Sequence, residues 1–150
     1  MAKNMSAAYE KDFYAWTVRN AALLRGGKLS EVDTEHVAEE IESMGKSEKR
    51  ELVHRLVILM VHLLKWKYQP VRRGRSWELT IREQRLGLQE LLEDSPSLKR
   101  SLSKHLTQAY ARALLMAEKE TGLSQNAFDK KCPFTLANIF DPKFFPGKRS

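Results

Sequence analysis

The chain has 150 residues, of which 26 are Lys or Arg and 19 are Asp or Glu, so its formal net charge is +7 at pH 7. This length is typical of one domain that buries enough apolar surface to fold without disulfides, and the single cysteine, Cys132, excludes an internal disulfide. The longest apolar run, residues 56–61, is far shorter than the roughly 20 residues that a membrane-spanning helix needs, and the polar N-terminus has no signal-peptide core. We therefore expect one cytoplasmic domain over residues 1–150, without a membrane span and with residues 1–8 and 147–150 flexible.

Positive charge is concentrated after the first third of the chain. Residues 1–45 hold 5 basic and 8 acidic side chains, whereas residues 46–105 hold 14 basic and 7 acidic ones. Such an excess favours encounter with polyanions, although it does not define a fold or a specificity. The composition predicts nucleic acid or an acidic protein as the partner.

The spacing of apolar residues is helical nearly everywhere, and no sustained alternation typical of a half-buried strand occurs. We expect an all-α fold, a single-domain bundle of about five helices with a short C-terminal helix and an aromatic tail. The first helix should span residues 9–25 and end at Gly26-Gly27. Asp33 should cap a second helix over residues 34–44 that ends at Gly45.

Three further helices are predicted. Ser47 should cap the third, over residues 47–67, whose apolar residues cover most of its circumference and place it in the middle of the bundle. Pro70 prevents this helix from continuing. Ser76 should cap a fourth helix over residues 77–93, and Ser95-Pro96 should start a fifth that ends near Gly122.

The segment over residues 65–77, here called the basic-aromatic connector, combines five cations and three large aromatic side chains without an acid. Lys and Arg neutralise phosphates, while aromatic rings stack on unpaired bases. This pattern predicts a binding surface, and its residues are Lys65, Trp66, Lys67, Tyr68, Arg72, Arg73, Arg75 and Trp77.

A purely structural role for the connector is the alternative. Trp66 and Trp77 flank helix ends and would then close the core. The three arginines would pair with the acidic second helix around residues 39–42. The sequence leaves both interpretations open.

Arg55 and His62 lie seven positions apart, which places them within about 20° on one helical face. Their spacing resembles the Arg-to-His motif of the HEPN helical ribonucleases, in which the two side chains act together on RNA. Leu56 stands where that family usually has a polar residue. The resemblance implies a helical ribonuclease with Arg55 stabilising phosphate charge and His62 transferring protons.

Glu51 and His54 repeat the Glu-x-x-His spacing of di-iron helical bundles, which need a second copy and two more glutamates. No second Glu-x-x-His occurs in the chain. No Gly-rich phosphate loop or other catalytic signature is present either. We therefore expect no metal site and no cofactor, and an enzyme is less expected than a binding protein.

Several segments together resemble the bacterial family catalogued as domain of unknown function 29. The resemblance is carried by residues 9–16 (YEKDFYAW), 39–45 (EEIESMG), 62–70 (HLLKWKYQP), Ser76-Trp77, 95–99 (SPSLK), 120–123 (ETGL) and Cys132-Pro133. It implies a compact all-helical protein over most of the chain and implies no activity.

Three functional hypotheses follow from these patterns. The first is a small binding module that holds nucleic acid or an acidic protein on the basic-aromatic connector. The second is the ribonuclease that uses Arg55 and His62. The third is a structural or regulatory partner protein, such as a homodimer, whose interface is the aromatic tail around Phe140, Phe144 and Phe145.

Overall fold

The computed structural model of the chain describes residues 8–147, and every regular element in that range is a helix. The α-helices are α2 (Phe13–Arg25), α3 (Thr34–Tyr68), α4 (Arg75–Asp94), α5 (Leu102–Thr121) and α6 (Leu136–Phe140). Short 3-10 helices lie between them: η1 (Leu29–Glu31), η2 (Pro70–Arg72), η3 (Pro96–Ser101) and η4 (Gln125–Ala127). The all-α prediction with its short C-terminal helix is confirmed. Residues 1–8 and 147–150 were predicted to be flexible. Of these, residues 1–7 and 148–150 lie outside the described residues.

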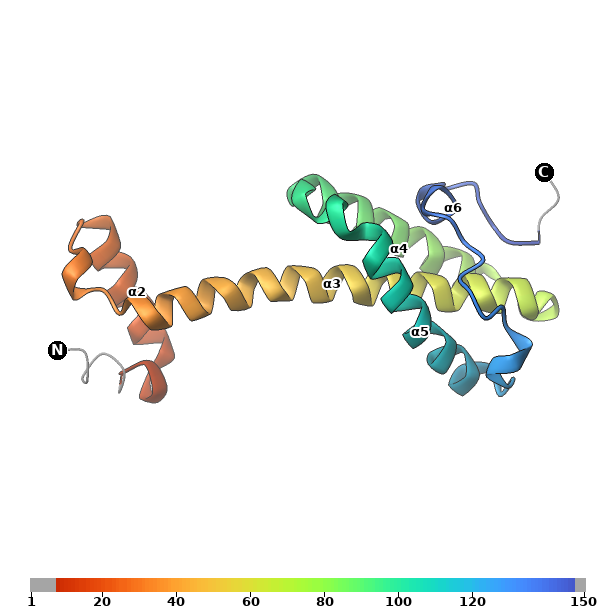
Figure 1. Ribbon diagram of the computed structural model, residues 1–150, viewed down its shortest axis with the longest axis horizontal. Coiled ribbons are helices and arrows are strands. Elements are labelled where there is room, and N and C mark those ends of the chain that lie inside the picture. Colours follow the sequence, from red (N-terminus) through yellow and green to blue (C-terminus); the bar gives the residue numbers. More distant parts are fainter. Residues whose placement is uncertain (1–7, 148–150) are drawn as a thin grey trace. The chain divides into compact units, whose positions relative to one another are not determined.

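The chain groups into two compact units, residues 1–47 and residues 48–150, and their boundary falls inside α3. In the N-terminal unit, α2 lies beside the first turns of α3 (Figure 1). Asp12 caps α2 by accepting a hydrogen bond from the backbone N–H of Ala15 (3.1 Å). The buried amide of Asn20 donates to the Trp16 carbonyl and accepts from the Asp33 N–H, both at 2.9 Å, so it joins α2 to the start of α3.

The C-terminal unit is built around residues 48–68 of α3. In Figure 1, α4 runs back along this part of α3, and α5 crosses it. Most of the circumference of α3 is buried here, as the prediction of a central helix requires, through Leu52, Leu56, Val57, Leu59, Met60, Val61, Leu63, Leu64 and Trp66. Each fully buried leucine contributes roughly 1.5–3 kcal/mol relative to an exposed one. The core therefore belongs mainly to this unit.

The break predicted at Gly45 is wrong, because α3 is one continuous helix of 35 residues. The described glycines with positive φ are Gly27, Gly122 and Gly147, so Gly45 keeps a right-handed conformation. Glycine inside a helix lowers helix stability by only about 1 kcal/mol relative to alanine. The helical turns on both sides of Gly45 can offset this loss. Ser47 consequently lies inside the helix and does not cap one.

Other predicted boundaries are displaced by a few residues. Helix α4 begins at Arg75, with Gly74 in the capping position in place of Ser76. Residues 96–101 form the 3-10 helix η3, because Pro96 supplies no N–H and Leu98 bonds to the Ser95 carbonyl, so α5 begins only at Leu102. The first predicted helix is also divided, into a short α-helical segment over residues 8–11 and α2, with a break at Asp12.

The last helical segment and the tail are fastened to α4 by Arg85. Its guanidinium donates from Nε to the Ile139 carbonyl (2.9 Å) and from Nη2 to the Asn138 carbonyl (3.0 Å). The side chain is 6 % exposed and lies 5.6 Å from the ring centre of Phe145. Thr135 and Asn138 form a capping box at the start of α6.

Candidate nucleic-acid interface

The basic-aromatic connector begins in the last turn of α3, which ends at Tyr68 as Pro70 predicts. Pro70–Arg72 form η2, and Gly74 leads into α4 with extended backbone. Val71 at the tip is 96 % exposed. The connector is therefore an exposed turn between two long helices, and its side chains differ in what they contact.

Trp66 is buried in the C-terminal unit, and Arg73 is partly buried beside it. Trp66 is 5 % exposed, and its ring centre lies 4.9 Å from that of Phe145. Arg73 donates from Nε to the Trp66 carbonyl (2.7 Å) and from Nη2 to the Pro146 carbonyl (3.3 Å). Its guanidinium also lies 5.3 Å from the Trp66 ring centre. These two side chains hold the aromatic tail against the end of α3.

Lys67 and Tyr68 share one carboxylate. Asp129 Oδ2 lies 2.8 Å from Lys67 Nζ and 2.6 Å from the Tyr68 hydroxyl. The hydrogen bond from Lys67, together with that from Tyr68, lowers the pKa of Asp129, and the same bond raises the pKa of Lys67. Burial and the bond to Asp129 raise the pKa of the Tyr68 phenol. The group is thus an ion pair with a neutral phenol, and it anchors the segment after η4 to α3.

Lys65 and Trp77 form a third group of connector side chains that contact other parts of the same unit. Lys65 Nζ lies 3.7 Å from Glu120 Oε2 at the end of α5 and 5.0 Å from the Trp77 ring centre. Both side chains are partly buried. A cation over an indole face contributes about 0.5–2 kcal/mol, and the value rises as the pair is removed from water. This contact fixes the start of α4 against the end of α3.

Arg72 and Arg75 are the two connector cations left for other partners. Both side chains are exposed. Within residues 8–147, neither forms an ion pair or a side-chain hydrogen bond with another residue. Six of the eight predicted residues therefore contact other parts of the C-terminal unit, whereas the guanidinium groups of Arg72 and Arg75 are available to a ligand.

Arg55 and His62 are engaged separately on α3. Arg55 Nε lies 3.1 Å from Glu51 Oε1, and its Nη1 donates to Gln84 Oε1 on α4 (3.3 Å). The guanidinium fills the space above Gly87, where an added Cβ would lie 2.2 Å from Nη1. His62 Nδ1 lies 2.8 Å from the Ile58 carbonyl, and burial lowers the pKa of its imidazole. In the described part of the chain, no hydrogen bond brings these two side chains together.

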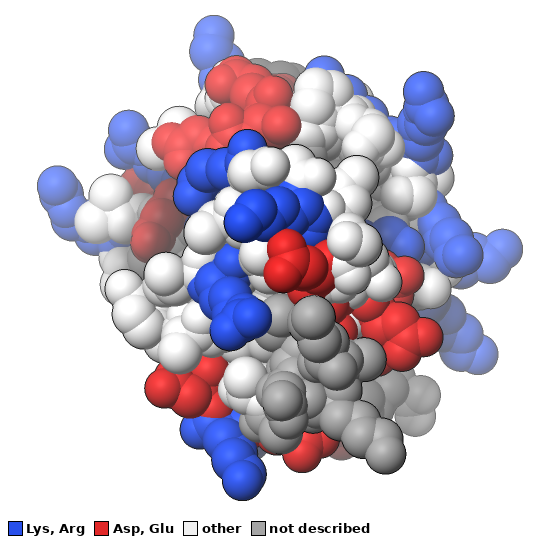
Figure 2. Space-filling view, turned by 90° about the vertical axis from the view of Figure 1, so that its left-hand side faces the viewer, with Lys and Arg blue, Asp and Glu red and all other residues white. Residues whose placement is uncertain are grey.

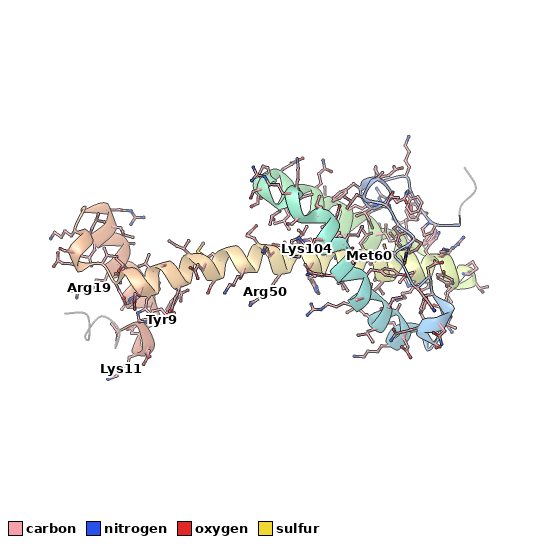
Figure 3. The ribbon with its side chains drawn as sticks, viewed as in Figure 1. Tyr9, Lys11, Arg19, Arg50, Met60 and Lys104 are labelled. Carbon is pink, nitrogen blue, oxygen red and sulfur yellow. The ribbon has the colours of Figure 1, made fainter. Side chains whose placement is uncertain are left out.

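The acids of the predicted second helix belong to the N-terminal unit. Glu40 accepts a hydrogen bond from the hydroxyl of Tyr9, which is labelled in Figure 3. This bond raises the pKa of Tyr9 to about 12. Figure 2 looks onto this unit and shows Asp and Glu side chains interspersed with Lys and Arg, so the described surface seen there has mixed charge.

Sequence reasoning missed a second polar cluster in this unit. Asp33 Oδ2 accepts from Trp16 Nε1 (3.0 Å) and lies 2.8 Å from His36 Nδ1. Burial acts to raise the pKa of Asp33, but the hydrogen bonds from Trp16 and His36 outweigh it and the pKa falls. The bond to Asp33 raises the pKa of His36, whose ring stacks on Tyr9 at 4.0 Å. The i,i+3 spacing of Asp33 and His36 at a helix start was the available signal.

The aromatic tail packs on the core of its own unit. Phe140, Phe144 and Phe145 are all partly buried there, and the Phe134 and Phe144 ring centres are 6.2 Å apart. Assembly of copies through this tail stays a prediction. No cluster of three or more His, Cys, Asp or Glu side chains in the described residues is arranged to hold a metal ion. No described helix combines the length and apolarity needed to cross a bilayer.

The chain belongs to the family described as Domain of unknown function DUF29, which matches residues 8–145. The resemblance read from the scattered segments is therefore confirmed. Searches of curated proteins and of solved structures find no match to this chain.

Proposed function

We propose that this DUF29 domain is a binding module for nucleic acid, and that the basic-aromatic connector is its central contact. The observation that carries the proposal is the pair of exposed guanidinium groups, Arg72 and Arg75, on the turn between α3 and α4. They project from a unit, residues 48–150, that holds 20 basic and 11 acidic side chains. Guanidinium groups bind phosphate oxygens in a bidentate manner, so these two suit a phosphate backbone.

The remaining connector residues have a supporting role in this proposal. Lys65, Lys67 and Arg73 are held by Glu120, Asp129 and backbone carbonyls, respectively. Trp66 is buried and Tyr68 is bonded to Asp129, whereas Trp77 is only partly buried. Binding should consequently depend on phosphate contacts more than on base stacking, with little sequence preference and a strong dependence on salt.

The test is a fluorescence anisotropy titration of labelled single-stranded RNA and duplex DNA at several salt concentrations. The informative variant is Arg72→Gln/Arg75→Gln, and Lys130→Gln/Lys131→Gln is the matched control because it removes the same charge from two other exposed residues. Loss of two phosphate contacts should lower the slope of log K against log salt by about 1.8 for duplex DNA and about 1.4 for a single strand.

Equal effects of the two double variants would show that only net charge matters and would refute a role of the connector. Absence of binding at low salt would refute nucleic acid as the ligand. In that case, binding of an acidic polypeptide such as polyglutamate, measured in the same way, would identify an acidic protein as the partner class.

A ribonuclease is the second proposal, and it rests on His62. Because burial lowers its pKa, the imidazole is neutral at pH 7, which is the form that accepts a proton as a general base. Arg55 would have to release Gln84 to reach a phosphate. Incubation of labelled RNA with wild-type protein and with His62→Ala tests this: cleavage by both proteins, or by neither, removes His62 from any mechanism.

A further inference from the structure

A second basic site lies on the C-terminal unit, away from the connector in the sequence. A cleft of ≈ 480 Å³ is lined by residues of α3 and α5. Four of the lining side chains are cations, Lys49 and Arg50 from α3 and Lys104 and Arg112 from α5. Figure 3 labels Arg50 and Lys104 near the place where α5 crosses α3.

Helical spacing explains why these residues converge. Lys104, Gln108 and Arg112 are four positions apart, so they follow one face of α5. On α3, Lys49 and Val53 are likewise four positions apart. The two faces line the same cleft, which joins segments that are more than 50 residues apart in the sequence.

In the connector, Lys65 and Lys67 are paired with Glu120 and Asp129, whereas none of the cleft's four cations has an acidic partner among the described residues. No Asp or Glu within residues 8–147 lines the cleft. Among the described residues, no ion pair or side-chain hydrogen bond involves any of the four cations, and all four are exposed. Four positive charges around one cleft, without an ion-pair partner among the described residues, attract an anion of several charges.

His105 adds a buried polar group to the floor of the cleft. It is 6 % exposed, and its Nδ1 is fully buried without a hydrogen-bond partner in the described chain. Nε2 also has no partner there but is not enclosed, so Nε2 is the nitrogen that reaches the cleft. Burying an N–H donor without an acceptor costs more free energy than burying an unprotonated ring nitrogen without a donor. The neutral imidazole therefore carries its proton on Nε2. His105 thereby presents a hydrogen-bond donor to a ligand.

We propose that this cleft binds a phosphate ester of several negative charges, namely a nucleotide that carries two or three phosphates. The four cations hold the phosphates, and His105 donates from Nε2 to one of their oxygens. The volume is in the range of small-molecule sites and far exceeds that of a single phosphate ion. Gln108 and Val53 supply the amide and the apolar surface that a nucleoside needs.

Isothermal titration calorimetry with ATP, in a buffer with EDTA and 150 mM salt, tests the proposal. AMP and inorganic tripolyphosphate are titrated alongside, because they carry the nucleoside or the charge alone. We expect ATP to bind with one site per chain, tripolyphosphate more weakly and AMP weakest. A single-stranded RNA with a 5′ triphosphate is titrated as well, because the end of a nucleic acid carries the same phosphate groups. Tighter binding of ATP than of this RNA supports the free nucleotide as the ligand, whereas tighter binding of the RNA overturns that assignment.

Two variants locate the site. Arg50→Gln/Lys104→Gln should raise the Kd for ATP by roughly tenfold to a hundredfold, because it removes two charge-assisted contacts. Lys130→Gln/Lys131→Gln removes the same charge from two exposed residues outside the cleft and should leave the Kd unchanged. His105→Gln retains a side-chain donor and should bind more tightly than His105→Leu.

The proposal is overturned if ATP does not bind to the wild-type protein, or if both double variants raise the Kd for ATP equally. It is also overturned if His105→Leu, with a helical circular dichroism spectrum like that of the wild type, binds ATP as tightly as His105→Gln. These results are independent of the nucleic-acid titration, which uses connector variants and a different ligand.

Discussion

Arg85 offers a sharp test of how the C-terminal segment is held. Its guanidinium is nearly buried and reaches from α4 to two backbone carbonyls of α6, those of Asn138 and Ile139. Replacement by methionine, Arg85→Met, keeps a long apolar stem but removes both donors. The two carbonyls are then left without these partners, and the tail loses its link to α4.

The expected loss follows from the contacts. A hydrogen bond to a charged group contributes about 1.5–3 kcal/mol, so two such bonds set an upper range of about 3–6 kcal/mol. Part of this is offset, because Nη1 of Arg85 has no partner in the described chain and the methionine no longer buries a cation. Burial lowers the pKa of Arg85, which reflects the same desolvation cost. We expect a net loss of about 2–4 kcal/mol in the free energy of unfolding.

Urea unfolding, followed by circular dichroism and by tryptophan fluorescence, measures this loss. For a chain of this size, it corresponds to a decrease of roughly 5–15 °C in Tm. Arg82→Met, on an exposed position of the same helix, is the matched control and should change stability by less than about 0.5 kcal/mol. A loss below about 1 kcal/mol for Arg85→Met, or an equal loss for Arg82→Met, would refute the reasoning.

Three further outcomes follow from single contacts. Asp33 raises the pKa of His36, so the stabilising effect of protonation is fully present below pH 6.5 and is lost as the pH rises through the folded-state pKa. In a pH series of urea unfolding, the free energy of unfolding of the wild type should therefore decrease over this range. The same decrease in His36→Gln would contradict the assignment. Lys67 is the main cause of the lowered pKa of Asp129, so the stability that this carboxylate contributes is present above pH 3.8 and is lost as the pH falls through the folded-state pKa. Asp129→Asn should lower the free energy of unfolding by up to about 1 kcal/mol at pH 7. It should also reduce the loss of stability at acidic pH in the same series. Gly122 has φ +76°, so Gly122→Ala should destabilise by about 1–2 kcal/mol, and an unchanged urea midpoint would be the contrary result.

The helices were predictable because their signals are local. The apolar period of 3.6 residues predicts each helix, and Pro70 ends α3 by lacking an N–H and by restricting its neighbour. Glycine is a weaker signal, as two positions show. Gly122 ends α5 in the left-handed conformation, whereas Gly45 continues α3. The sequence does not distinguish these glycines, since either conformation is open to a residue without a side chain.

The candidate sites were less predictable because they join distant segments. The cleft requires α3 and α5 to cross so that Lys49 and Arg50 meet Lys104 and Arg112. No local pattern connects these pairs, since each is an ordinary polar position on a helix surface. Burial of His105 was predictable from the sequence, because the neighbouring Leu102, Leu106 and Ala109 mark the buried side of α5.

The connector shows why a local run of charge does not measure the charge that a partner meets. No acid occurs within residues 65–77, which favoured a free basic surface. Its acidic partners, Glu120 and Asp129, come 55 and 62 residues after Lys65 and Lys67, respectively, and pair with them in the folded chain. A pair that is satisfied in this way contributes to stability and must be broken before it contributes to affinity. Affinity for phosphates should therefore follow Arg72 and Arg75, whereas acid stability should follow Asp129, and the two can be measured independently.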